Sequence, residues 1–248
     1  MKIKHAIIFA LLVTILLTNL YLLSSFSAEK SSKQTAIIGR VIDGDTVVLA
    51  DSTRIRLVNI NSPEKNVPAH ILAMNYLMQF ENKTVYLENL GTDKYQRTLA
   101  RIYSQDGKYL NLALVDNGLA SKFLVQESEL SAYSKAETNA IESSKGIWKH
   151  SIHYGCLSSE IDKYKEIVII INNCPQIKLK DFAIKDESRK TYKFSSTQFS
   201  RIALHSGSGQ DNSTDLFWGQ QDVWNNDRDT LYLFDNESLL VHYNSYGY

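Results

Sequence analysis

The segment 41–64, VIDGDTVVLADSTRIRLVNINSPE, constrains the fold of this 248-residue chain more than any other stretch. Residues 46–49 and 53–60 are two short runs rich in β-branched side chains, and such runs predict β-strands. A preceding apolar run breaks at residues 43–45, Asp-Gly-Asp, and the Asp-Gly pair is a strong turn signal. The segment therefore predicts a series of short strands connected by tight turns.

The turn and the strand after it also carry charged side chains. Asp43 and Asp45 flank Gly44, and clustered carboxylate and carbonyl oxygens are the ligands that hold hard cations such as Ca²⁺. Taken alone, these residues fit an ordinary hairpin turn, since Asp and Gly are favoured in turns whatever their chemistry. Arg56 alternates with apolar neighbours in the next run, so its side chain faces away from theirs, and Glu64 follows that run directly.

A second charged cluster, residues 93–97 (DKYQR), precedes another strand-like run at 98–104. The order DGDT, then R-x6-PE, then DKYxR-x-LA-x-IY, then NLALVDNGLA at 111–120 resembles the staphylococcal-nuclease-like family, the thermonucleases. The resemblance covers residues 35–150. It implies a five-stranded OB-fold barrel with helices packed on it, and a calcium-dependent nuclease that hydrolyses DNA and RNA with little sequence specificity.

The resemblance also implies roles for individual residues. Arg56, Glu64 and Arg97 match the family's catalytic residues, and Lys94 and Tyr95 match residues that contact a nucleotide phosphate. Scission of the 5′-O bond, which leaves a 3′-phosphate, is implied as well. The tyrosines on which family members stack their ligand have no counterpart further along this chain, so we expect the substrate to stack differently.

The calcium ligands that the resemblance implies are Asp45, Asn61 and the backbone carbonyl of Ser62, with Asp43 in an outer position. The family has an aspartate where Asn61 stands. An amide oxygen still binds calcium, but the difference removes one negative charge, and calcium affinity depends largely on ligand charge and rigidity. We therefore expect weaker calcium binding than in the family.

The chain begins with a short basic stretch, and residues 6–28 contain no charged side chain. This length is close to the ~20 apolar residues of a membrane-spanning helix. Residues 1–34 are therefore predicted to be either a cleaved signal peptide or a retained N-terminal membrane anchor, followed by a polar linker. In both cases we expect the rest of the chain to be extracellular, secreted or anchored to the outer face of the cell membrane.

Further elements are predicted before residue 150. Alternating runs predict two more strands, and five short strands in all indicate a small closed barrel. Three segments with apolar residues at helical spacing predict helices, the second ended by Gly118 and the third by Gly146. The predicted strands are 84–90 and 98–104, and the predicted helices are 69–80, 111–117 and 128–144.

Residues 155–248 are predicted to form a second domain, because strand patterning replaces helical patterning near residue 150. Seven short strand-like runs separated by turn residues indicate an antiparallel β-sandwich. The stretches HSGSG (205–209) and WNNDRDTLYL (224–233) resemble the lamin tail domain, which implies an immunoglobulin-like β-sandwich. The seven runs are 166–171, 177–184, 191–194, 201–205, 215–218, 230–234 and 239–243.

The chain has two cysteines, Cys156 and Cys174. An even number of cysteines in an exported chain predicts a disulfide, with two free thiols as the alternative. A disulfide here would close a short loop at the start of the second domain.

The charge of the chain is balanced, with 27 basic and 27 acidic residues. Proteins that bind nucleic acid usually carry a basic excess, although two or three well-placed arginines are enough to bind one phosphate. An alternative function therefore stands beside the nuclease: a non-catalytic surface protein that binds nucleic acid or serves adhesion. In either case we expect a monomer.

Overall fold

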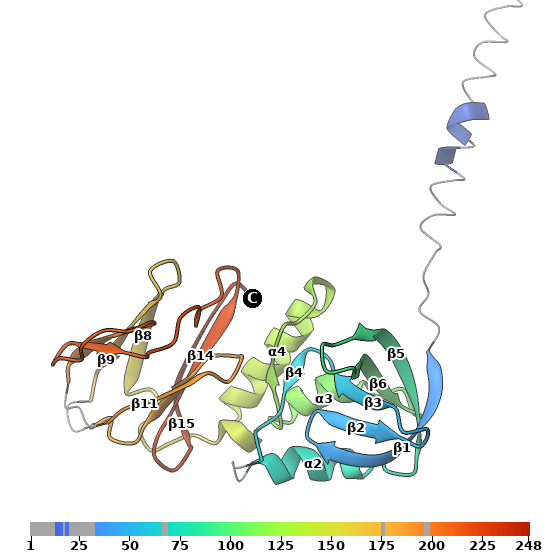
Figure 1. The fold of residues 1–248 in the computed structure, drawn as a ribbon, viewed down its shortest axis with the longest axis horizontal. Coiled ribbons are helices and arrows are strands. Elements are labelled where there is room, and N and C mark those ends of the chain that lie inside the picture. The colour runs from blue at the N-terminus through green and yellow to red at the C-terminus, as the bar shows by residue number, and fades with distance from the viewer. Residues whose placement is uncertain (1–12, 17, 20–32, 66–68, 175–176, 196–198) are drawn as a thin grey trace, which may run out of the picture.

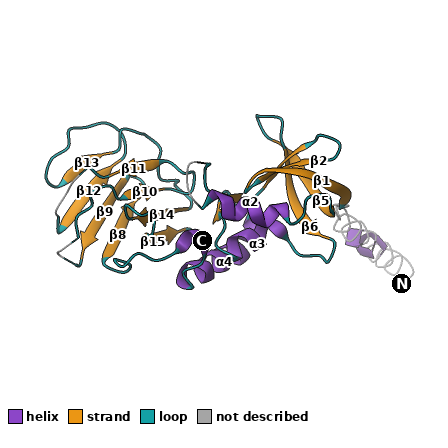
Figure 2. Cartoon of the chain, turned by 90° about the horizontal axis from the view of Figure 1, so that it is seen from below, coloured by secondary structure: helices purple, strands orange, loops and turns teal. Residues whose placement is uncertain are grey.

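The computed structural model describes residues 13–16, 18–19, 33–65, 69–174, 177–195 and 199–248 (Figure 1). Two β-rich parts are joined by a group of helices that lies between their strands, as both views show (Figure 2). Almost all of the predicted N-terminal segment lies outside the described residues, so the choice between signal peptide and anchor stays a prediction. Within the described residues, no helix is long and apolar enough to cross a membrane.

The first part is a closed five-stranded barrel, as predicted for an OB-fold. Its strands are β1 (Gln34–Asp43), β2 (Thr46–Leu49), β3 (Arg54–Leu57), β5 (Thr84–Thr92) and β6 (Thr98–Ser104). They follow the order β1-β2-β3-β6-β5, and neighbours are antiparallel except β3 and β6, which are parallel. Inward side chains such as Ile38, Val47 and Ile55 form the buried core of the barrel.

The predicted strand 53–60 is divided in two, and its prediction as one strand was wrong. β3 ends at Leu57, and a turn leads into β4 (Ile60–Asn61), which pairs with β7 (Ser121–Lys122) outside the barrel. Asn59 in this turn has a φ of 68°, in the left-handed region that Asn adopts more readily than β-branched residues. The turn carries the residues after β4 back toward Asp45.

Three helices pack against the barrel near their predicted positions (Figure 2). They are α2 (His70–Met78), α3 (Leu110–Asp116) and α4 (Leu130–Glu142), and the short 3-10 helices η1 (Glu127–Glu129) and η2 (Gly146–Trp148) flank α4. Gly118 follows α3 in the left-handed conformation, as predicted. After α4 that position belongs to Ser144, whose N–H donates to the carbonyl of Ile141, so the assignment of this helix end to Gly146 was wrong.

Helix α2 lies directly over the turn between β1 and β2. A Cβ atom at Gly44 would come within 2.3 Å of the Cβ of Ala73 in α2 and within 2.7 Å of the Cβ of Ser62. Only glycine fits at this close approach. The Asp-Gly-Asp turn, the helix and the segment after β4 are therefore packed against one another, and this packing places Asp45.

The second part consists of two four-stranded sheets. The first has the order β11-β10-β14-β15 and the second the order β13-β12-β9-β8. Buried side chains of both sheets, among them Ile170, Leu204, Ile184 and Leu233, form one core, so the sheets make a β-sandwich. The strands are β8 (Leu157–Asp162), β9 (Ile167–Asn172), β10 (Ala183–Lys185), β11 (Thr191–Lys193), β12 (Arg201–His205), β13 (Asp215–Phe217), β14 (Asp229–Phe234) and β15 (Leu240–Tyr246).

Three details of the sandwich differ from the sequence prediction. Strand β8 was not predicted, and the run 177–184 is a strand only at its end, in β10. The strands are not all antiparallel, because β12 and β13 are parallel. The predicted disulfide is confirmed: Cys156 and Cys174 are bonded, and they join the start of β8 to the end of β9.

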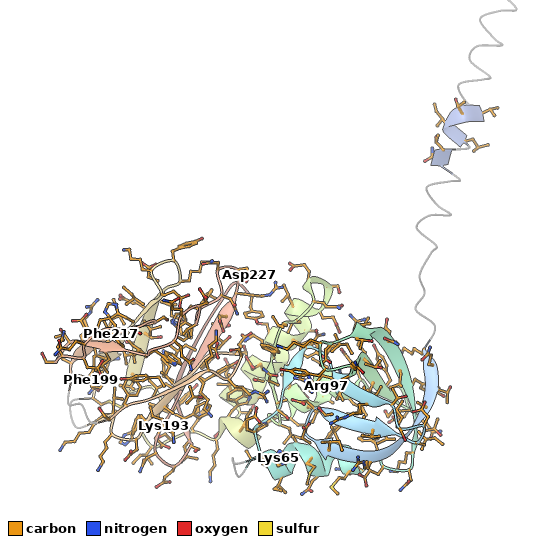
Figure 3. All side chains as sticks on the ribbon, in the orientation of Figure 1. Lys65, Arg97, Lys193, Phe199, Phe217 and Asp227 are labelled. Carbon is orange, nitrogen blue, oxygen red and sulfur yellow. A yellow bond between two sulfur atoms is a disulfide. The ribbon has the colours of Figure 1, made fainter. Side chains whose placement is uncertain are left out.

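The two parts share a buried interface. Trp148 of η2 stacks on Tyr232 of β14 with 4.8 Å between ring centroids, and Ile141 of α4 and Leu240 of β15 belong to the same buried cluster. Backbone hydrogen bonds join Leu240 to residues 149 and 151. Figure 3 shows side chains filling both parts, with Arg97 on the barrel and Lys193 on the sandwich.

Candidate active site

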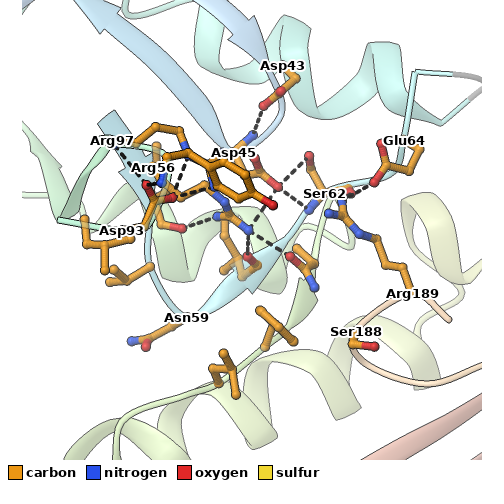
Figure 4. A pocket seen from close by; sticks show the side chains of 18 of the residues that line it. Asp43, Asp45, Arg56, Asn59, Ser62, Glu64, Asp93, Arg97, Ser188 and Arg189 are labelled. Carbon is orange, nitrogen blue, oxygen red and sulfur yellow. Dashed lines mark hydrogen bonds and ion pairs between the residues drawn. The ribbon is translucent and has the colours of Figure 1, made fainter. Parts of the chain in front are cut away.

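A cavity of about 1090 Å³ opens where the barrel, the segment after β4 and the second domain meet. Its lining includes the Asp-Gly-Asp turn, residues 56–65, residues of the 93–97 cluster, residues 123–126 in part, and Ser188 and Arg189 of the β10–β11 turn. Figure 4 shows their side chains pointing toward one another. All of the predicted catalytic, metal-binding and phosphate-contacting residues therefore line one cavity.

Asp45 is the buried centre of this site. Its Oδ2 accepts hydrogen bonds from the backbone N–H of Ser62 at 2.9 Å and from the Ser62 hydroxyl at 3.0 Å, and Thr46 Oγ1 donates to its Oδ1. Asp43 accepts a bond from the N–H of Asp45 at 3.1 Å. These bonds join the turn to the segment after β4, so the carboxylates and the carbonyl of Ser62 lie together.

The two carboxylates differ in their electrostatic surroundings. Burial and the nearby charge of Asp45 raise the pKa of Asp43. Burial alone would raise the pKa of Asp45 as well, but the guanidinium of Arg56, whose Nη2 lies 3.4 Å from Asp45 Oδ2, and the hydrogen bond from Ser62 lower it. Asp45 is thus held as a carboxylate.

Arg56 extends from β3 into the cavity and is almost fully buried. Its guanidinium donates to the carbonyls of Leu57 and Ile60, the latter at 2.7 Å, and to Asn61 Oδ1 at 2.8 Å. Burial and the neighbouring charges of Arg97 and Arg189 lower the pKa of Arg56, while Asp45 opposes them. An arginine remains charged under such shifts, so three guanidinium groups meet around this cavity.

Arg97 is held at the start of β6 by Asp93. Its Nε and Nη2 both lie 2.7 Å from Asp93 Oδ2, and its backbone N–H donates to Asp93 Oδ1. The exposed ring of Tyr95 lies beside the guanidinium, 5.5 Å from centroid to Cζ, and Lys94 lies over the same ring. This cluster presents positive charge and an aromatic face at the mouth of the cavity.

Asn61 makes two hydrogen bonds that the sequence did not suggest. Its Oδ1 accepts from Arg56, and its Nδ2 donates to the backbone carbonyl of Glu187 in the second domain at 2.8 Å. An aspartate at this position has no N–H to donate. The departure from the family pattern at Asn61 thus coincides with a contact to the second domain.

Arg189 is the site residue that sequence reasoning missed. Its Nη1 lies 2.8 Å from the carbonyl oxygen of Ser62 and 3.0 Å from Oε1 of Glu64. The partners are more than 120 residues apart in the sequence, and no local motif around Arg189 signals the contact. The cavity is therefore formed by both domains.

The oxygens around Asp45 fit a hard cation by their kind. The carboxylates of Asp43 and Asp45 and the carbonyl of Ser62 are ligands of the type that Ca²⁺ prefers. Two of the implied ligand oxygens, Asn61 Oδ1 and the Ser62 carbonyl, accept hydrogen bonds from arginines. In the part of the chain that the structure describes, no group of three or more His, Cys, Asp or Glu side chains is arranged to hold a metal.

Sequence comparisons agree with the geometry of the first part. A profile of the family described as "Staphylococcal nuclease homologue" matches residues 54–150. An "Uncharacterized endonuclease" of Haemophilus influenzae is 34% identical over 140 residues, which are 54% of this chain and 78% of that protein. "Endonuclease YhcR" of Bacillus subtilis is 28% identical over 138 residues, which are 46% of this chain but 11% of that protein. An "Uncharacterized endonuclease" of Escherichia coli O157:H7 is 38% identical over 85 residues, which are 33% of this chain and 56% of that protein.

Proposed function

The chain belongs to the family of staphylococcal nuclease homologues and is a nuclease, and from this premise we propose that it hydrolyses the phosphodiester bonds of DNA and RNA with Ca²⁺ as its cofactor and with little sequence specificity. The observation that carries the proposal is the meeting of Arg56, Arg97 and Glu64 around one cavity beside a buried carboxylate, Asp45. Positioned cationic groups stabilise the charge that develops on phosphate oxygens, and a carboxylate within reach of water can act as a general base.

The two arginines bind the phosphate. Arg56 is held by backbone carbonyls and Arg97 by Asp93, so both guanidinium groups are oriented before a substrate arrives. Groups held in this way stabilise the charge that grows on the phosphate oxygens in the transition state without reorganising. Lys94 and Tyr95 contact a neighbouring part of the nucleotide at the mouth of the cavity.

Glu64 acts as the general base. Glu64 lies at the edge of the cavity, and its carboxylate is exposed. This carboxylate takes a proton from the water molecule that attacks the phosphorus. The bond to the 5′-oxygen then breaks, that oxygen takes a proton from solvent to become a hydroxyl, and a 3′-phosphate remains, as the family resemblance implies. Asp45, Asn61 and the carbonyl of Ser62, with Asp43 further out, would hold Ca²⁺, which neutralises phosphate charge when bound.

The location and the second domain belong to the same proposal. Export is supported by the apolar N-terminal segment in the sequence and by the disulfide, since disulfides persist in oxidising compartments. The protein is then secreted, or stays on the outer face of the cell membrane if the segment is retained. The sandwich is a lamin-tail-like, immunoglobulin-like domain, and the protein acts as a monomer.

One assay tests the central proposal. Purified protein is incubated with end-labelled single-stranded DNA and RNA of equal length, with Ca²⁺ and with the chelator EGTA. We expect cleavage of both at many positions, with 3′-phosphate ends, in the Ca²⁺ samples only. Binding without cleavage in every sample would contradict the proposal and favour the non-catalytic alternative.

A further inference from the structure

We propose that Arg189, in the second domain, is a positioning residue of the nuclease site, where it holds Glu64 and the Ser62 carbonyl in their working places. This inference rests on the proposed function and deepens it, because it makes the second domain part of the active site. Apart from Ser188 and Arg189, every residue that lines the cavity belongs to the first part of the chain.

The contacts of one guanidinium carry the proposal. Arg189 Nη1 donates to the carbonyl of Ser62 at 2.8 Å and lies 3.0 Å from Oε1 of Glu64 (Figure 4). It therefore joins two points of the short segment that carries both the proposed base and a proposed metal ligand. Both contacts come from the same nitrogen, which carries two N–H donors whose directions are fixed by the plane of the guanidinium.

The value of this contact lies in geometry rather than in stability. The carboxylate of Glu64 is 64% exposed and the side chain of Arg189 is 37% exposed. Ion pairs this exposed contribute little to folding stability, typically less than about 1 kcal/mol. A mobile base is a poor catalyst, because proton transfer requires hydrogen-bond distance and direction. Arg189 is thus expected to affect the reaction because it limits the motion of the exposed Glu64 side chain.

The turn that carries Arg189 is held by several local hydrogen bonds. Arg189 has a φ of 76°, in the left-handed region that non-glycine residues rarely adopt. Asp186 closes this β10–β11 turn, accepting from the N–H of Lys190 at 2.7 Å and from the hydroxyl of Ser188 at 2.6 Å, and Thr191 donates to the carbonyl of Arg189. Unfavourable backbone conformations held by surrounding bonds are concentrated at functional sites.

Glu187 connects the same turn to the first part of the chain. Its buried carboxylate lies 3.1 Å from Nζ of Lys122, which also bonds to Glu137 of α4 at 2.6 Å. Its backbone carbonyl accepts the hydrogen bond from Nδ2 of Asn61. Burial opposes the charge of Lys122, but the two glutamates beside it raise its pKa, so the cation stays in place. The turn is thus docked through a buried charged group and through Asn61.

The first experiment compares full-length wild type, Arg189→Ala, Arg189→Lys and a matched control, Lys190→Ala. Lys190 lies in the same turn and carries the same charge, but its Nζ contacts the carbonyl of Asp222 and lies 4.0 Å from Asp186 Oδ2, and it contacts neither Glu64 nor Ser62 in the structure. We expect Arg189→Ala to lower kcat at least ~10-fold with KM changed less than about twofold, and Arg189→Lys to recover part of the loss. The control should keep wild-type kinetics, and all four proteins the same Tm within a few degrees.

Other kinetic results would overturn the assignment. A raised KM with unchanged kcat would mean that Arg189 binds substrate instead of positioning the base. Unchanged or increased activity would mean that the contact is incidental or inhibitory. An equal loss in Lys190→Ala would assign the effect to the charge of the turn rather than to the side chain of Arg189.

A second measurement does not depend on activity. Hydrogen exchange of the peptide that covers residues 59–65 should be faster in Arg189→Ala than in wild type and Lys190→Ala, and equal exchange in all three would contradict the contact. If wild type cleaves nothing while this difference is found, the proposed function fails and the contact stands. If wild type cleaves and Arg189→Ala keeps its kcat, the inference fails and the function stands.

Discussion

At the scale of single residues, Glu64 and Arg97 give the clearest test of the chemistry, because both are partly exposed and make few buried contacts. We expect Glu64→Gln and Arg97→Lys each to lower kcat at least ~10²-fold, since each removes an interaction made in the transition state. Tm should change little in Glu64→Gln, because substitutions at exposed sites usually alter the free energy of unfolding by less than about 0.5 kcal/mol, and little in Arg97→Lys, because the lysine keeps the positive charge beside Asp93.

Arg56→Lys serves as the contrasting variant in the same series. It should lower kcat as strongly, but also Tm, because a lysine cannot replace the bonds of the buried guanidinium to Leu57, Ile60 and Asn61. Rates and thermal unfolding are measured on the same preparations. Wild-type turnover in any of the three variants would remove that residue from the catalytic set.

Asn61→Asp separates two roles of one side chain. The added negative charge should lower the Ca²⁺ concentration for half-maximal activity. The lost Nδ2 bond leaves the buried carbonyl of Glu187 without its donor and facing a carboxylate, which should cost about 1–3 kcal/mol of unfolding free energy. Calcium titration of activity and denaturant unfolding without calcium measure the two effects. An unchanged calcium requirement would show that Asn61 is not a ligand.

The predictability of the site follows sequence distance. Arg56, Glu64 and Arg97 stand in motifs that resemble the nuclease family, the resemblance assigned them to one site, and they line one cavity. Arg189 lies on another domain, and its contacts depend on how two surfaces dock. The amide of Asn61 was noticed as a departure, but its partner Glu187 was not visible in any pattern.

At the scale of secondary structure, two errors in the sandwich arose because the pattern of polar and apolar residues was used to infer the backbone conformation. Residues 177–180 alternate like a strand, with Ile177 and Leu179 buried, but the chain then turns, and the N–H of Phe182 bonds to the carbonyl of Leu179. The alternation of apolar and polar residues therefore indicated which side chains are buried, but not that the backbone forms a strand. Strand β8, LSSEID, escaped prediction because its polar residues outnumber its apolar ones. Strands β2, β5 and β6 of the barrel were predicted within two residues of their observed ends, whereas the run 53–60 proved to be two strands.

Strand β14 begins with a buried acid that should make stability depend on pH. Burial, with a contribution from Asp186, raises the pKa of Asp229 to about 6. The folded state therefore binds the carboxyl proton of Asp229 more tightly than the unfolded state does. The stability that this protonation contributes is fully present below about pH 4 and is lost as the pH rises through 6. Relative to wild type, Asp229→Asn should gain on the order of 2–3 kcal/mol between pH 4 and pH 7.

The neighbouring strand β15 carries a group of opposite sign. Burial lowers the pKa of His242 to about 4, so its contribution is complete above about pH 6.5 and is lost as pH falls toward 4. Wild type alone can therefore show a flat profile, and the difference between variant and wild type is the quantity to measure by denaturant unfolding. His242→Gln should give the opposite slope. Parallel profiles for Asp229→Asn and wild type would contradict the assignment.

At the scale of the whole molecule, the two domains are joined more closely than the sequence boundary near residue 150 suggested. Trp148 is only 1% exposed, and it is covered by Tyr232 of the second domain. Lys122 of the first domain is equally buried, between Glu137 and Glu187. The change in composition and strand pattern near residue 150 therefore marks the end of the barrel part and its helices. It does not mean that the two parts are separate, because their side chains pack in one interface.

This interface predicts how the molecule unfolds. The full chain should unfold in one cooperative transition, whereas a chain ending at His150 should have a lower Tm, because it exposes Trp148 and leaves Lys122 with only one of its carboxylates. The loss should be on the order of 3 kcal/mol, comparable to truncating a buried tryptophan.

Trp148 is the one tryptophan of the shortened chain, since the other two of the three lie beyond residue 150, so its emission reports directly on the exposed surface. We expect a red-shifted maximum, with full-length Trp148→Phe as the control for the loss of the indole alone. An unshifted maximum together with an unchanged Tm would show that the barrel part folds without its partner and that the interface is not needed for its stability.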